Sequence, residues 1–158
     1  MRKILFTILA ALGINFGAKS QTEKLDIGLK NTLKSTADKF ENKNHAFLIN
    51  LAKGNIVIMQ IVHGALIEQT ATQTNSFNFS INLTFDNERE ALKRFKKLKI
   101  SEKFKYYEYD GITCYAINFG NDQKVTSDVT LEILNKVYGF EYSDIFEFEI
   151  FDQGPINR

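Results

Sequence analysis

The chain has few of the residues from which metal centres and covalent cross-links are built. Cys114 is the one cysteine in 158 residues, which excludes an intrachain disulfide framework and a zinc site made from several cysteines. His45 and His63 are the two histidines, too few for a histidine-rich metal centre. One proline and the absence of tryptophan exclude proline-rich recognition segments and tryptophan binding platforms. We therefore expect no metal and no cofactor.

The composition that remains is that of an ordinary folded domain. Hydrophobic residues make up 44% of the chain and charged residues 25%, which is typical of a globular protein and excludes a disordered or fibrous one. The length favours a single domain.

The first 20 residues have the three-part layout of a secretory signal peptide. Arg2 and Lys3 form a basic start, the run 4–12 is apolar apart from one threonine, and small residues precede a cleavage point between Ser20 and Gln21. The apolar stretch is shorter than the ~20 residues of a membrane-spanning helix. We expect residues 1–20 to be removed and residues 21–158 to form one periplasmic or secreted domain. The alternative is an amphipathic or buried helix at the N-terminus of a cytosolic protein.

Hydrophobic periodicity predicts three helices and six strands. Apolar residues recur at helical spacing over 23–41, 86–98 and 124–138, with Asp86 or Asn87 as the cap of the second helix and Gly139 as the stop of the third. Strands are predicted over 46–51, 56–62 (continuing beyond Gly64 as 66–72), 77–85, 104–109, 112–119 and 144–151. The Asp110-Gly111 pair predicts a type I′ hairpin turn.

These elements predict a two-layer α+β domain with the order α-β-β-β-α-β-β-α-β. Tight turns between successive strands favour a mainly antiparallel sheet, with helices on one face and solvent or a partner on the other. The strand 77–85 alternates most regularly: its phenylalanine, isoleucine and leucine side chains predict a dry face, and Asn78, Ser80, Asn82 and Thr84 predict a wet one.

Charge is strongly segregated along the chain. Residues 87–105 carry eight basic and three acidic side chains, whereas residues 106–158 carry three basic and ten acidic ones. Arg89, Lys93, Lys96 and Lys97 recur at spacings of three and four, so they share one face of a helix. One interpretation is a binding surface for an acidic protein, glycan or lipid head group. The other is a solvated helix face neutralised by the acidic last strand, which contains Glu147 and Glu149.

Aromatic residues follow this basic block on both faces of one strand. Phe104 and Tyr106 are predicted to point one way, and Tyr107 and Tyr109 the other. Tyrosine tolerates half-exposure and is enriched at interfaces, so Tyr106, Tyr107 and Tyr109 are candidate binding residues together with the basic helix. Sheet packing explains them equally. Near-neutral charge after processing, with 17 basic and 19 acidic residues, argues against a nucleic-acid partner.

No catalytic motif accompanies the possible nucleophiles. No serine lies in a nucleophile elbow, and no phosphate loop, dinucleotide fingerprint or metalloprotease motif is present. An enzyme is therefore less expected than a binding protein. The competing hypothesis is a small-ligand carrier or a hydrolase that uses a cavity between sheet and helices, with His45, His63 or Cys114 in it. We expect Cys114, within a strand-like run, to be a buried apolar residue, with a reactive thiol as the alternative.

The order helix, three strands, helix, two strands, helix over residues 23–138 resembles the type III secretion chaperone-like fold. No motif residue carries this resemblance, and the signal peptide and the strand 144–151 depart from it. It implies a non-catalytic, often dimeric, protein-binding domain. The sequence thus predicts an exported protein-interaction module with a protein partner, and a homodimer is compatible with it.

Overall fold

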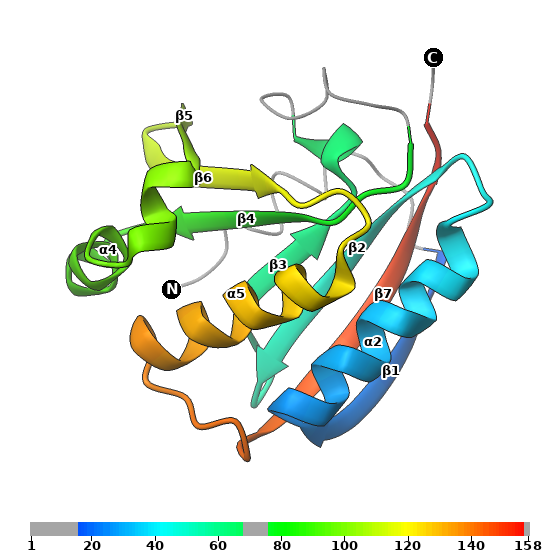
Figure 1. The fold of residues 1–158 in the computed structure, drawn as a ribbon, viewed down its shortest axis with the longest axis horizontal. Coiled ribbons are helices and arrows are strands. Elements are labelled where there is room, and N and C mark those ends of the chain that lie inside the picture. Colours follow the sequence, from blue (N-terminus) through cyan, green and yellow to red (C-terminus); the bar gives the residue numbers. More distant parts are fainter. Residues whose placement is uncertain (1–15, 68–75, 157–158) are drawn as a thin grey trace.

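The computed structural model describes residues 16–67 and 76–156. In this part of the chain, seven strands form one antiparallel sheet in the order β1-β7-β2-β3-β4-β6-β5, accompanied by three α-helices (Figure 1). The α+β class and the predicted order from the first helix onward are confirmed. One further strand, β1, precedes that helix.

The described part of the chain contains twelve helical and strand elements in sequence. They are β1 (Phe16–Lys24), α2 (Leu25–Phe40), β2 (His45–Lys53), β3 (Ile56–Val62), the 3-10 helix η1 (Gly64–Leu66), β4 (Ser80–Phe85), α4 (Arg89–Lys96), the 3-10 helix η2 (Lys99–Lys103), β5 (Lys105–Tyr109), β6 (Ile112–Asn118), α5 (Gln123–Lys136) and β7 (Ile145–Pro155).

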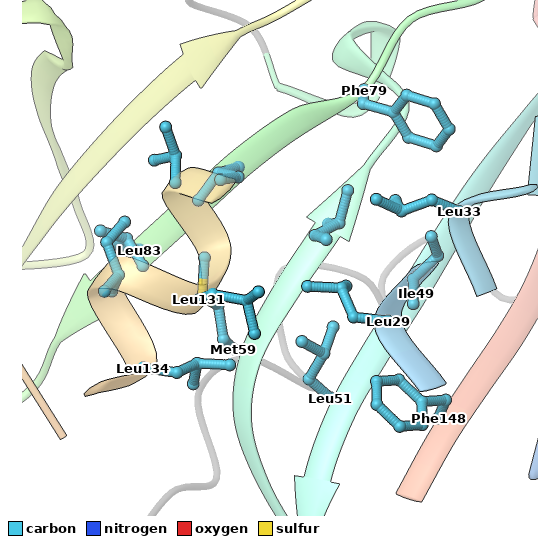
Figure 2. Close-up of a cluster of buried hydrophobic side chains, with 14 of the residues drawn as sticks. Leu29, Leu33, Ile49, Leu51, Met59, Phe79, Leu83, Leu131, Leu134 and Phe148 are labelled. Carbon is cyan, nitrogen blue, oxygen red and sulfur yellow. The ribbon is translucent and has the colours of Figure 1, made fainter. Parts of the chain in front are cut away.

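Helices α2 and α5 pack side by side on one face of the sheet and bury the main core (Figure 1). In this core, Leu29 and Leu33 of α2 contact Ile49 and Leu51 of β2 (Figure 2). Leu131 and Leu134 of α5 lie on the other side of the same cluster. These side chains are fully or almost fully buried. Their burial supplies the main driving force for folding.

Two turns form as their sequences predict. Asp110 and Gly111 have φ values of 48° and 76°, the pair of positive angles that a type I′ turn requires between β5 and β6. Helix α5 ends through Gly139, at φ 77°, while the N–H of Gly139 donates to Asn135 O and that of Phe140 to Leu134 O. Gly139 is therefore the predicted helix stop.

The solvent-exposed face predicted for residues 77–85 is wrong for three of its four residues, while the fourth, Thr84, is half-buried. Asn78, Ser80 and Asn82 are buried, with at most 6% of each residue exposed. They lie on the sheet face away from α2 and α5, where a second apolar cluster, centred on Leu48 and Val62, is also buried. Polar side chains tolerate this burial because they hydrogen-bond one another.

Two local predictions in the middle of the chain are also corrected. The strand does not continue beyond Gly64: residues 64–66 form a 3-10 turn because the N–H of Gly64 donates to Asn78 Oδ1 instead of to a sheet partner. The remainder of the predicted stretch, from residue 68, lies outside the described residues. Helix α4 is capped neither by Asp86 nor by Asn87: its N-cap is Glu88, because Asn87, at φ 55°, turns the chain in the left-handed region.

Strand β7 is longer than predicted and is not an edge strand. It continues to Pro155, which pairs with His45, and it lies between β1 and β2. Residues 1–15 of the predicted signal peptide lie outside the described residues, whereas Phe16–Ser20 form the first half of β1. Among the described helices, none has the length and apolar character needed to cross a bilayer.

Candidate functional site

The basic block folds into α4, η2 and the start of β5, at the end of the sheet farthest from β1 (Figure 1). Eight cations of this block are exposed, and we call six of them the basic surface: Arg89, Lys93, Lys96, Lys97, Lys99 and Lys103. The other two are Arg94 and Lys105. All four helix residues singled out by their spacing therefore belong to it.

Helix α4 is anchored by a narrow apolar stripe, which leaves its cations in solvent. Phe95 is fully buried, and its ring lies 5.4 Å from that of Phe85, 5.1 Å from Phe104 and 5.0 Å from Tyr115. These aromatic contacts attach α4 to β4, to β6 and to the residue that ends η2, immediately before β5. The remaining helix circumference is free to present charge.

Two cations of this block have specific partners. The Lys93 ammonium lies 2.8 Å from Glu90, and both side chains are about 70% exposed (68% and 72%), so this ion pair contributes little to stability. Arg94 donates from Nε to Val137 O at 2.6 Å, at the C-terminal end of α5. Arg94 therefore has a structural role, since it satisfies a helix carbonyl.

The other cations of the basic surface have no such partner. Arg89, Lys96, Lys97, Lys99 and Lys103 form no ion pair with any described residue. The local potential is positive: the hydrogen bond and the charge of Lys93 lower the pKa of Glu90, and the charges of Arg94 and Lys97 lower it further. An anionic group would be attracted to this surface.

The acidic last strand does not neutralise the basic surface. Glu147 and Glu149 are on β7, and β2, β3 and β4 separate β7 from β6 in the sheet. Glu149 instead accepts a hydrogen bond from Asn50 Nδ2 at 3.3 Å. The acidic residues of β7 are thus separated in space from the basic surface, although Glu108 of β5 lies beside Tyr106 at the basic end of the sheet.

The three candidate tyrosines do not form one surface. Tyr106 is 58% exposed and packs 5.6 Å from Tyr115, the ring that also contacts Phe95 of α4. Tyr107 is on the opposite face, where its hydroxyl donates to Asn82 Oδ1 at 2.6 Å and burial raises its pKa. Tyr109 shares the face of Tyr107 and is 41% exposed. Tyr106 is therefore the tyrosine that accompanies the basic surface.

The two histidines are engaged in local hydrogen bonds. His45 Nδ1 lies 2.9 Å from Asp152 Oδ1, the atom that also accepts the N–H of Gly154. Burial alone would raise the pKa of Asp152, but the hydrogen bonds from Gly154 and His45 and the charge of Lys39 outweigh it and lower the pKa. His63 is 1% exposed, its Nδ1 accepts the N–H of Ala65, and burial lowers its pKa.

Cys114 is buried and far along the sheet from both histidines. His63 directly follows Val62, the last residue of β3. Val62 pairs with Ser80 of β4, and Ser80 pairs with Asn118 of β6, so His63 lies near the level of Asn118 in the sheet. Cys114 is four residues from Asn118, a displacement of roughly 13 Å along the strand. Burial raises the pKa of its thiol, which disfavours the reactive thiolate. The structure therefore does not bring a cysteine–histidine pair together.

The described surface has a depression of about 490 Å³ at the start of α2, and it contains none of the residues predicted for a site. It is lined by Lys24, Asp26, Ile27, Asn135, Glu141, Tyr142 and Ser143. Among the described residues, no group of three or more histidine, cysteine, aspartate or glutamate side chains could hold a metal ion.

Sequence reasoning missed a buried polar cluster at the start of β4. Asn78 Oδ1 accepts hydrogen bonds from Gly64 N at 2.9 Å, Asn118 Nδ2 at 3.0 Å and Ser80 Oγ at 3.3 Å. A Cβ on Gly64 would lie 2.7 Å from Asn78 Oδ1, so a larger residue there would displace the side chains of the cluster. The sequence signal for this cluster was the alternation of Asn78 and Ser80 with apolar residues, but alternation alone predicts that the polar side chains are exposed.

Comparison with protein-family models, with curated proteins and with solved structures finds no match to this chain.

Proposed function

We propose that this protein is an exported, non-catalytic interaction module that binds an acidic segment of a partner protein through the basic surface. The observation that carries the proposal is the set of exposed cations on α4 and η2 that have no described ion-pair partner. Exposed Tyr106 lies next to them and adds an aromatic contact of the kind enriched at interfaces.

The proposal requires these cations to be available rather than used by the fold. Arg94 is used by the fold, through Val137, and Lys93 is weakly paired with Glu90. The acidic residues of β7 lie toward the other end of the sheet. Charges held in this way steer a partner of opposite sign, raise the association rate and make binding sensitive to salt.

Charge reversal tests the proposal. The triple variant Lys93→Glu, Lys96→Glu, Lys97→Glu removes the centre of the basic surface, and Lys30→Glu, Lys34→Glu, Lys43→Glu makes the same change in net charge on α2 and the following turn. All six lysines are exposed. Crosslinking pull-down from the envelope fraction, with thermal unfolding as the check on folding, compares both variants with the wild-type chain.

We expect the wild-type chain and the control triple to crosslink the same partner, and the basic-surface triple to lose it. Raising the salt concentration should weaken the wild-type complex. If a polyanion such as heparin or DNA binds as tightly as the captured protein, the basic surface binds polyanions in general rather than one protein partner. Equal capture by both triples would remove the basic surface from the proposal.

A further inference from the structure

The predicted processing point lies inside β1, and this has consequences for the strand next to it. Ser20 pairs with Glu149 and Gln21 with Phe148. The bond between Ser20 and Gln21 therefore divides β1 into a first half, which lies opposite Glu149–Asp152, and a second half, which lies opposite Ile145–Phe148. Cleavage there would remove the first half.

The second half of β1 is held in place independently of the first. Gln21 Nε2 donates to Thr32 Oγ1 of α2 at 2.9 Å, and Asn31 Nδ2 of α2 donates to Glu23 at 3.1 Å. The backbone N–H of Leu25 donates to Asp144 O at 2.8 Å. Residues 21–24 therefore keep their place on β7 after cleavage, and the opening is confined to Glu149–Asp152.

The opened half of β7 is only partly protected as a sheet edge. Edge strands are normally short or carry charged residues or proline. Strand β5, the edge at the other end of the sheet, has five residues and includes Lys105. The opened stretch is also short and carries Glu149 and Asp152, but it has no lysine or proline, it contains the apolar pair Ile150 and Phe151, and its other side is fixed to β2. Strand β1 itself shows that this edge accepts an extended antiparallel segment.

We propose that processing after Ser20 converts Glu149–Asp152 into a strand-binding edge, and that it takes up an extended segment of a partner protein with a basic residue opposite Glu149. The inference rests on the export part of the proposed function, and its partner is distinct from that of the basic surface. In the unprocessed chain the neutral Ser20 occupies the position opposite Glu149. A lysine or arginine there adds a favourable cross-strand charge pair.

The processed and unprocessed full chains can be compared by changing one residue. Ser20→Leu blocks cleavage because the residue before the cleavage point must be small, and Ser20→Ala is the matched control that is still cleaved. Mass spectrometry of the exported proteins identifies the N-terminus. Backbone amide exchange then reports on residues 149–152, whose N–H groups alternate between β2 and the β1 side.

We expect the amides on the β1 side to exchange at least tenfold faster in wild-type and Ser20→Ala protein, which begin at Gln21, than in Ser20→Leu protein. An amidated peptide with the sequence of residues 13–20 should bind the processed protein and restore their protection. Its Ser20→Lys form should bind more tightly and its Ser20→Glu form less tightly. A peptide with prolines in place of Ala18 and Lys19 should not bind, because proline cannot donate to the ladder.

Three results would overturn the inference. Equal exchange in the Ser20→Ala and Ser20→Leu proteins would show that the edge does not open. A processed protein whose edge amides become protected as it forms dimers would assign the edge to a second copy of the chain. An exported protein with an N-terminus elsewhere would remove the premise, whereas the charge-reversal experiment on the basic surface would be unaffected.

Discussion

Gly28 of α2 lies directly against the ring of Phe148 on β7. A Cβ on residue 28 would lie 2.8 Å from Phe148 Cζ and 2.9 Å from Cδ2, and closer still to Cε2. The first helix therefore packs on the sheet with its backbone, at a point where any side chain would force the ring away. Gly28 is buried, and so is Phe148.

We predict that Gly28→Ala destabilises the protein, although alanine is the better helix former. The helix itself would gain about 1 kcal/mol, whereas overpacking a filled core costs about 1–3 kcal/mol. Urea unfolding should show a net loss of free energy of unfolding. The matched control is Ser35→Ala on the same helix, which should change stability by less than about 0.5 kcal/mol.

The partner of this contact can be checked separately. In a Gly28→Ala background, Phe148→Leu makes room for the new methyl group. Phe148→Leu should therefore lower the free energy of unfolding less in that background than in the wild-type chain. Additive costs, or a Gly28→Ala variant more stable than the wild type, would contradict the close approach.

The buried histidine predicts a loss of stability in mild acid. Burial lowers the pKa of His63 below its ordinary value of 6.5, so the unfolded chain takes up a proton more readily than the folded one. His63 should therefore have no effect on the pH dependence of stability above about pH 6.5. Below that, the free energy of unfolding should decrease as the pH falls from about 6.5 to the lowered pKa of His63. Urea unfolding between pH 5 and pH 8 measures this slope.

A His63→Gln variant should lose that part of the pH dependence, while His45→Gln should retain it. Since Ala65 N–H donates to His63 Nδ1, the glutamine variant should also be less stable at pH 8. An unchanged slope in His63→Gln would show that another group is responsible.

Arg94 and Lys96 are neighbours in the basic block with different expected roles. Arg94→Ala removes the hydrogen bond to Val137 O and should lower the free energy of unfolding by about 1 kcal/mol, since Arg94 is an exposed residue and its bond is screened. Lys96→Ala should leave stability within about 0.5 kcal/mol of the wild type and weaken binding to the acidic partner. Thermal unfolding and the pull-down together separate the two effects, and equal destabilisation would contradict the assignment.

Local patterns were sufficient to predict the helices, the hairpins and the basic helix face. The spacing of Leu25, Leu29 and Leu33 is visible within two turns of helix, and the Asp110-Gly111 turn needs no information from elsewhere. Arg89, Lys93, Lys96 and Lys97 lie within a stretch of nine residues, so their clustering could be predicted before the fold was known.

The features that were missed depend on pairing between distant segments. Residues 21–24 carry no apolar alternation, and they form a strand because β7 offers them an edge. Asn82 alternates with apolar residues as an exposed side chain would, but Tyr107 of another strand covers and binds it. The distance between the basic helix and Glu149 depends on strand order, and strand order is not a property of any local window.

The position of β7 also determines when the fold can be completed during synthesis. It is the last strand to be made, yet it lies between β1 and β2, two of the first. During synthesis, α2 and the β2–β3 hairpin therefore exist long before β7, the strand that connects β1 to β2 in the sheet. Long-range pairing of this kind is slow. A chain threaded through a membrane channel from its N-terminus would be held open until its final residues emerged. Loss of those residues would leave β1 without its sheet partner, so truncation at the C-terminus should prevent folding rather than shorten an edge.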